Sequence, residues 1–273
     1  MVRARGLTFA VFSTPPVSGA PPIVCINGGM LYDHSMLWPA LSPLATKRQV
    51  ILYDQRGRGA SSAPADPSQA TIDDDAGDVG ALRRALGIRQ WDVLGHSWGG
   101  GIAMLGTARD LAGVRKLVLV NAVGPTGSWM SPLRANVLAR VDGEQYQIVS
   151  QTSEAMLGIP DPALHSTYSR AVYPAWFADR DMAARFAPPD ARSETGTAVL
   201  ARLRQGYDWS QTVRGISVPT LIIHGVDDAL PLAVSRENSY IIPNARHEDV
   251  PAAGHMPFWE APQRFFALID SFL

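Results

Sequence analysis

The chain has 273 residues, of which 46% are hydrophobic and 18% are charged, and its formal net charge is −1. This composition allows one large α/β domain, or such a domain with a small insertion, around a sizeable buried core. The near-neutral charge and the scattered arginines form no basic surface, so we expect neither a nucleic-acid partner nor binding to an anionic membrane.

Short β-branched runs alternate with helical patterns along most of the chain, which predicts an α/β fold with a mostly parallel sheet. The segment RGLTFAVF predicts an early antiparallel strand. The strands expected after it cover residues 23–27, 50–54, 91–94, 116–121, 220–224 and 247–250, and the helices expected between them cover residues 36–45, 72–86, 98–109, 232–240 and 262–272.

Residues 125–216, called the insertion below, break this alternation. They contain no convincing strand. Their pattern predicts short helices that are rich in aromatic residues and methionine and are separated by prolines. We predict that they form a helical lid, and that residues 1–124 and 217–273 form the core domain, because long insertions in compact α/β domains are usually functional. The alternative is a set of extra helices that pack on the sheet without a role in binding.

The cysteine content and the hydropathy of the chain indicate in which cellular compartment the protein is expected. The single cysteine, Cys25, lies in the apolar run PPIVCING, which is typical of a buried core thiol and excludes an internal disulfide. The N-terminal stretch has early arginines but no sustained apolar region, and no run is long and apolar enough to span a bilayer. We expect a cytoplasmic protein, a monomer or a homodimer, without a membrane partner.

The residues Gly95-His96-Ser97-Trp98-Gly99 match the pattern G-x-S-x-G. A predicted strand ends here and a helix begins, so Ser97 lies on a sharp turn that lifts its hydroxyl above the strand end, and the glycines avoid clashes at that turn. The helix N-terminus favours developing negative charge. We predict that Ser97 is a nucleophile rather than a serine in a glycine-rich turn. His96 is too close in sequence to act as its base.

A serine hydroxyl needs a general base, and that base needs an orienting acid, in the chain order serine, acid, histidine. His255 is the candidate base because it lies in the small-residue loop VPAAGHMPFWEAP before the last predicted helix, at the sheet edge where active sites gather. The strand PTLIIHGVDDALP runs into Asp227 and Asp228. We favour Asp228 as the acid and interpret Asp227 as a loop residue. Asn121 would be a poor substitute for an acid.

Two backbone N–H groups must receive the oxyanion. Trp98, the residue after the nucleophile, is expected to supply one of them. The turn in VCINGGM follows an early strand and is expected to supply the other from Gly29, whose amide no side chain obstructs. An ordinary glycine turn is the alternative, but four separate elements in the expected order favour a catalytic site.

With these motifs the chain resembles the α/β-hydrolase superfamily and, within it, the proline iminopeptidase-like group. The resemblance lies in INGGMLYDHSMLWPALSPLA, VILYDQRGRGASS, LGHSWGG, IIHGVDD and AGHMPFWEAP, so it covers nearly the whole chain and is weakest in the insertion. It implies an α/β-hydrolase fold with an inserted helical lid. It also implies that Ser97, Asp228 and His255 are nucleophile, acid and base, that Gly29 and Trp98 are the oxyanion donors, and that Asp54 and Arg56 are structural.

Two features depart from the iminopeptidase pattern. The group usually has His-Gly-Gly-Pro-Gly where this chain has Asn27-Gly28-Gly29-Met30-Leu31, so the oxyanion turn can differ in shape. Those peptidases also bind the free amino group of the substrate with lid glutamates, whereas the segment YPAWFADRD offers Asp179 and Asp181 instead. We expect Arg180 and Arg185 to neutralise these aspartates locally, so we expect ester substrates to be preferred over N-terminal proline residues.

We therefore predict a serine hydrolase that cleaves an ester bond, or an amide or lactone bond, of a small apolar substrate, with no metal and no organic cofactor. The alternatives are a proline iminopeptidase, a carbon–carbon bond hydrolase or lyase with the same triad, and a ligand-binding protein on a hydrolase scaffold. The residues predicted to contact the substrate are Met30, Trp129, Trp176 and Phe177.

Overall fold

The computed structural model describes residues 1–188 and 192–273. Its centre is a seven-stranded sheet in the order β3-β5-β4-β6-β7-β8-β9, in which β3 is antiparallel to β5 and all other neighbours are parallel. The strands are β3 (Val11–Ser13), β4 (Ile23–Ile26), β5 (Val50–Tyr53), β6 (Trp91–His96), β7 (Val114–Val120), β8 (Thr220–Gly225) and β9 (Ala245–Val250). The predicted α/β architecture is confirmed.

The early strand predicted in RGLTFAVF is divided in the structure. Two short strands, β1 (Val2–Ala4) and β2 (Leu7–Phe9), form a separate antiparallel pair, and only β3 joins the main sheet. The division falls at Ala10, whose N–H donates to the Ser61 hydroxyl and whose carbonyl accepts from the Asp54 N–H.

Helices cover both faces of the sheet because successive strand residues point to opposite sides. In β4, Val24 and Ile26 belong to one apolar cluster, while Ile23 and Cys25 belong to the other. The first cluster packs beneath α1 (Ile72–Ala85), α2 (Trp98–Arg109), α9 (Ser210–Arg214) and α10 (Leu232–Ile241), and the second beneath α11 (Pro257–Glu260), α12 (Pro262–Phe272) and the 3₁₀ turns η1 (His34–Met36) and η2 (Ser42–Thr46). A third 3₁₀ turn, η3 (Pro67–Gln69), precedes α1.

The helix predicted over residues 36–45 is wrong. The chain forms the separate turns η1 and η2 there instead. The apolar spacing is helical, but Pro39 and Pro43 lack the N–H groups that a continuous helix needs, and the Pro39 ring would clash with the preceding turn. Leu37 and Leu41 still reach the core, since both are buried in the second cluster.

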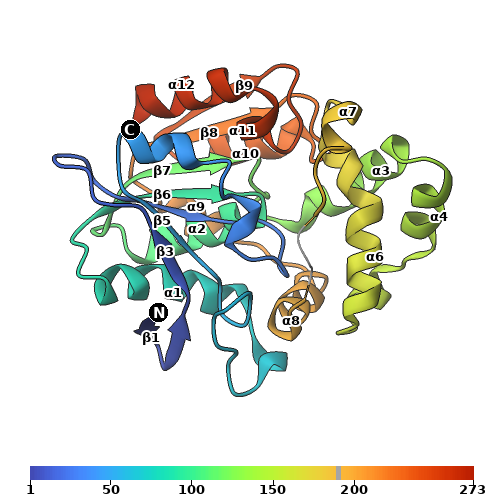
Figure 1. Ribbon diagram of the computed structural model, residues 1–273, viewed down its shortest axis with the longest axis horizontal. Coiled ribbons are helices and arrows are strands. Elements are labelled where there is room, and N and C mark those ends of the chain that lie inside the picture. Colours follow the sequence, from blue (N-terminus) through green and yellow to red (C-terminus); the bar gives the residue numbers. More distant parts are fainter. Residues whose placement is uncertain (189–191) are drawn as a thin grey trace.

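The insertion folds into short helices between β7 and β8. They are η4 (Gly127–Trp129), α3 (Met130–Arg140), α4 (Gly143–Gln151), α5 (Glu154–Leu157), α6 (Pro162–Val172), η5 (Tyr173–Trp176), α7 (Arg180–Ala183) and α8 (Glu194–Leu203), followed by α9. Figure 1 shows α3, α4, α6 and α7 gathered at one end of the sheet, on the right of the view, whereas α8 lies lower in the view. These helices enclose a small apolar cluster of their own, which includes Val137, Val149 and Ala175. In the described part of the chain no helix is long and apolar enough to cross a membrane.

Candidate active site

Ser97 occupies the turn between β6 and α2 in a strained backbone conformation, with φ 55° and ψ −121°. Its N–H donates to the Val120 carbonyl, and its own carbonyl accepts from the N–H groups of Gly100 and Val123. Non-glycine residues persist in such conformations only where their surroundings fix them, and these cases cluster at functional sites. The strain therefore supports a functional role for the Ser97 side chain.

The glycines around Ser97 are required by close backbone approach. A Cβ atom at Gly95 would lie 2.4 Å from the Gly99 carbonyl oxygen, and one at Gly99 would lie 2.2 Å from the carbonyl oxygen of Ile26 in β4. Any larger residue would push α2 away from the sheet and move Ser97 with it. The G-x-S-x-G pattern thus reflects the packing of a helix directly against two strand ends.

Asp228 and His255 lie together beyond the ends of β8 and β9. The Asp228 Oδ2 atom is 2.7 Å from His255 Nδ1 and also accepts from Asn121 Nδ2 at 2.6 Å, while Oδ1 accepts from the Leu230 N–H at 2.9 Å. Both Asp228 and His255 are 4% exposed. This geometry fixes the imidazole and leaves Nε2 as the nitrogen that can exchange a proton with a substrate or with Ser97.

The surroundings keep Asp228 ionised. Burial raises the pKa of its carboxyl group, but the charge and hydrogen bond of His255, the nearby His224 and the Asn121 amide together hold the pKa below its ordinary value. His224 donates from Nε2 to the Leu230 carbonyl at 3.0 Å, so it also fixes the loop that carries Asp228. Asn121 is therefore a partner of the acid rather than a substitute for it.

Asp227, the other acid candidate, does not contact His255. Its side chain is exposed and lines a shallow hollow on the outside of the molecule, together with Arg140 and Asp179. Its backbone N–H donates to the Ala253 carbonyl. Of the two adjacent aspartates, only Asp228 is placed to orient the imidazole.

His96 supports the loop of His255 from below. Its Nε2 donates to the His255 carbonyl at 2.9 Å, and the two rings lie 4.8 Å apart. Burial, together with the neighbouring His255, lowers the pKa of His96 to about 3, so His96 stays neutral. Among the described residues no hydrogen bond joins Ser97 Oγ to His255 Nε2, and such catalytic contacts often tighten only with substrate bound.

The turn after β4 lies against Ser97. A Cβ atom at Gly28 would lie 2.5 Å from the Ser97 Cβ, and Gly29 has φ 67° with no room for a side chain beside the Tyr32 ring. The Asn27 amide donates to the carbonyls of Gly28 and Tyr32, at 3.2 and 3.1 Å. This side chain therefore closes the turn.

Arg58 is a supporting residue that the sequence did not single out. It is fully buried, and its Nε donates to the Met30 carbonyl at 2.8 Å, while its two terminal nitrogens hold Asp75 at 2.9 and 3.0 Å. It therefore fixes the far side of the same turn. The sequence signal that could have identified Arg58 is its position between two glycines in the segment RGRG, two residues after the structural Arg56.

A cavity of about 260 Å³ joins Ser97, His255, Gly29 and Trp98. Three of the four residues predicted to contact the substrate, Met30, Trp129 and Trp176, line it, and the other lining residues are mostly apolar: Leu31, Val123, Met130, Leu133, Val137, Leu157, Val172, Leu200, Leu203 and Leu230. In the described part of the chain no aspartate or glutamate lines this cavity. A free ammonium group would therefore find no carboxylate partner among the described residues of its wall.

Phe177 does not contact this cavity, contrary to the prediction. It is 4% exposed and stacks with Phe186 and contacts Tyr173 within the second apolar cluster. The chain is extended at Phe177, with φ −100° and ψ 143°, so adjacent side chains point in opposite directions and Trp176 reaches the cavity instead.

Asp179 and Asp181 lie outside the cavity. Asp179 caps α7 by accepting the Asp181 N–H at 2.8 Å, and it lines the outer hollow. Arg180 pairs with Asp142 at 3.3 Å and not, as expected, with the neighbouring aspartates Asp179 and Asp181.

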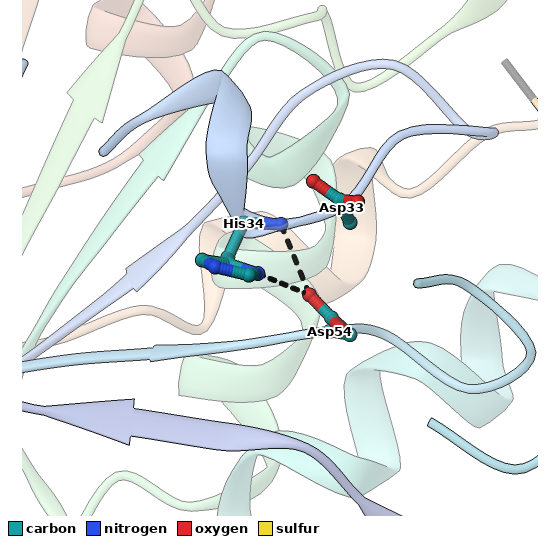
Figure 2. Close-up of side chains that lie close together, drawn as sticks. All are labelled: Asp33, His34 and Asp54. Atoms are coloured by element: carbon teal, nitrogen blue, oxygen red, sulfur yellow. Dashed lines mark hydrogen bonds and ion pairs between the residues drawn. The ribbon is translucent and has the colours of Figure 1, made fainter. Parts of the chain in front are cut away.

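Asp33, His34 and Asp54 form a second polar group, in which the possible ligand atoms for a metal lie within 4.8 Å of one another. Figure 2 shows both the backbone N–H and the Nδ1 of His34 directed at one oxygen of Asp54, at 3.1 and 2.7 Å. The other Asp54 oxygen accepts from the Ala60 N–H at 2.8 Å. These bonds tie together two loops beside the sheet, which agrees with the structural role expected for Asp54.

Comparisons with known proteins agree with this geometry. Residues 21–262 match the family model for the alpha/beta hydrolase fold. A proline iminopeptidase from Lactobacillus delbrueckii subsp. lactis is 28% identical over 92% of this chain and 90% of its own length. A 2-hydroxymuconate semialdehyde hydrolase from Pseudomonas putida is 31% identical over 83% and 77%. The crystal structure of the enol-lactonase from Burkholderia xenovorans LB400 has a TM-score of 0.72 at 25% identity, covering 98% of this chain and 97% of that one. The chain therefore belongs to the α/β-hydrolase family and is a hydrolase, with proline iminopeptidases among its relatives.

Proposed function

We propose that the protein is a serine hydrolase that cleaves an ester bond of a small, largely apolar compound, and that residues 125–216 form the lid over its site. The observation that carries this proposal is one apolar cavity lined by both Ser97 and His255, with Asp228 bound to His255 Nδ1 at 2.7 Å. Lactones and amides are possible variants of the same acyl-transfer chemistry.

In the proposed mechanism, Ser97 Oγ attacks the substrate carbonyl while His255 Nε2 takes its proton. Asp228 holds the imidazole in the required tautomer and stabilises the imidazolium that forms. The N–H groups of Gly29 and Trp98 receive the oxyanion, and the N-terminus of α2 adds a favourable dipole. His255 then returns the proton to the leaving group, and water activated by the same histidine hydrolyses the acyl-enzyme.

The cavity wall supports an ester substrate over an N-terminal proline residue. A desolvated ammonium group without a carboxylate partner costs several kcal/mol, and no acid from the described residues lines the cavity. Its volume, about 260 Å³, is below the usual range for drug-sized ligands, about 300–1,000 Å³, which supports a small substrate.

A carbon–carbon bond hydrolase is the second candidate. Relatives include the 2-hydroxymuconate semialdehyde hydrolase, and the cavity is lined by Arg134. Within the described chain, Arg134 bonds only backbone carbonyls, those of Val149, Ser150 and Thr152, and no carboxylate. A guanidinium group in that position fits a substrate that carries its own carboxylate.

A substrate panel separates the candidates. The panel contains p-nitrophenyl esters of increasing acyl length, prolyl and alanyl p-nitroanilides, and a 2-hydroxymuconate semialdehyde, each assayed with the wild type and with Ser97→Ala. We expect the esters to react fastest, with kcat/KM rising by about fourfold per methylene until the cavity is filled, which corresponds to about 0.8 kcal/mol per buried methylene.

Variants of the lid aspartates provide the control for the peptidase alternative. Asp179→Asn and Asp181→Asn should leave ester turnover nearly unchanged, because both residues lie outside the cavity. Prolyl anilide turnover that exceeds ester turnover and collapses in either variant would instead establish an iminopeptidase. Preferential cleavage of the semialdehyde, lost in Arg134→Gln, would establish the second candidate.

A further inference from the structure

Helix α3 of the insertion contacts the backbone of the loop that carries Asp228. Asn136 and Arg140 lie four residues apart and so share one face of this helix. Asn136 Nδ2 donates to the Ala229 carbonyl at 2.9 Å. Arg140 Nη2 donates to the Asp228 carbonyl at 3.0 Å, and Nη1 donates to the carbonyls of Asp227 and Ala175. One helix face therefore binds three consecutive carbonyls of the acid loop.

The acid loop also belongs to the hydrophobic interior of the insertion. Ala229, the residue after Asp228, is fully buried, and it packs in the apolar cluster formed by Val137, Val149, Ala175 and their neighbours from α3, α4, α6 and η5. The core domain supplies no other buried residue to this cluster among the described residues. The loop that carries Asp228 therefore packs inside the apolar interior of the insertion and is not merely covered by it.

The loop of His255 is held by the next part of the insertion. The His255 N–H donates to the Trp176 carbonyl at 2.7 Å, and the Trp176 ring lies 4.3 Å from the imidazole. A Cβ atom at Gly254 would lie 2.3 Å from the same carbonyl oxygen, so the two backbones touch. Glu260 links them further, since its carboxylate accepts from the Gly254 N–H at 2.8 Å and the Ala178 N–H at 2.6 Å.

From these contacts we propose that α3 and η5 are a fixed part of the catalytic support, rather than a cover that swings away from the site, and that Arg140 is a positioning residue for Asp228. The proposal rests on the triad of the proposed function. Arg140 lies outside the substrate cavity and contacts the outer hollow, so it acts through the Asp228 backbone and not on the substrate. A displacement of about 1 Å in a catalytic group can lower a rate by about 100-fold.

A double-mutant cycle tests this assignment. Arg140→Gln should lower kcat for a p-nitrophenyl ester by about 10- to 100-fold with KM within about twofold of the wild type. In an Asp228→Asn background the same substitution should lower kcat by less than about twofold, because the residue through which it acts is already impaired. Arg140→Lys should recover part of the loss, since it keeps one donor.

The matched control is Arg180→Gln. Arg180 lines the same outer hollow and bonds Asp142 and the Arg140 carbonyl, but it does not contact the acid loop, so this variant should retain wild-type kcat. Asn136→Ala removes a single bond to the loop and should lower kcat by less than Arg140→Gln does. This second variant keeps the proposal testable if Arg140→Gln folds poorly.

Three results would overturn the proposal. They are a wild-type kcat in Arg140→Gln, a decrease in kcat by the same factor in the wild-type and Asp228→Asn backgrounds, and an effect on KM alone. Labelling of Ser97 by a fluorophosphonate keeps this test separate from the proposed function. If Ser97 is labelled in the wild type and Arg140→Gln has no effect, only the positioning role fails. If Ser97 is not labelled, the proposed triad itself fails.

Discussion

Changing Asp228 to asparagine removes one charge and one acceptor from the centre of the site at nearly constant size. Oδ2 faces two donors, His255 Nδ1 and Asn121 Nδ2, whereas Oδ1 faces one, the Leu230 N–H. If the new amide nitrogen takes the Oδ1 position, it opposes the Leu230 N–H and the imidazolium loses its stabilising charge. If it takes the Oδ2 position, it opposes Asn121 and turns the imidazole to the wrong tautomer, with the proton on Nε2.

Both orientations weaken the general base. Loss of tautomer control in a triad of this type costs about 10⁴-fold in kcat, which corresponds to about 5.4 kcal/mol at 1.36 kcal/mol per tenfold. Each orientation also leaves a buried donor opposite another donor, which costs about 1–3 kcal/mol of folding stability. We therefore expect Asp228→Asn to lower kcat by roughly 10³- to 10⁴-fold while the protein remains folded.

Steady-state kinetics with a p-nitrophenyl ester measure this effect, with circular dichroism to verify the fold. Asp227→Asn is the matched control, because it makes the same chemical change one residue away on an exposed side chain that does not contact His255. The control should retain activity within about twofold, as surface substitutions usually do. A loss smaller than about tenfold in Asp228→Asn, or a crippled Asp227→Asn, would refute the assignment of the acid.

Ser97→Ala and His255→Ala should each lower kcat by several orders of magnitude, and the double variant should be no slower than either, because the two residues act as a unit; additive losses would contradict this. With an ester substrate, kcat/KM should rise with pH between about pH 5 and 8, since the base must be neutral to take the proton of Ser97. The buried His96, with its pKa lowered to about 3, is already neutral there and does not contribute to the rise. A flat profile between about pH 5 and 8 would indicate another base. Asp75→Ala should lower the free energy of unfolding by about 3–5 kcal/mol, because it leaves the fully buried Arg58 unpaired; a urea midpoint equal to that of the wild type would argue against this ion pair as a stabilising contact.

The sequence was most informative where a local pattern has one physical solution. Short, largely apolar runs that end at turn residues predict buried strands, and all six residues of Trp91–His96 are buried in β6. The glycines flanking Ser97 have no room for side chains. The helix expected over residues 36–45 does not form because two prolines lie inside it and interrupt its hydrogen bonds.

Contacts between distant segments could not be predicted in the same way. The bonds from Arg140 to the Asp228 loop and from the His255 N–H to the Trp176 carbonyl join residues more than 75 positions apart, and nothing in their local sequence encodes a partner. Phe177 is expected at the cavity from the aromatic content of the insertion, but extended backbone turns the side chains of Trp176 and Phe177 to opposite sides. Composition identified the aromatic character of the insertion, but only packing decides which rings face the cavity.

The central claim is that Ser97 is a nucleophile activated by His255. Incubation of the wild-type protein with a fluorophosphonate, followed by intact-mass measurement and peptide mapping, tests it most directly. The account predicts a single phosphonyl adduct on Ser97 and complete loss of ester hydrolysis, with no adduct in Ser97→Ala and greatly slowed labelling in His255→Ala. An adduct on a different residue, or an unlabelled protein that still hydrolyses esters, would contradict it.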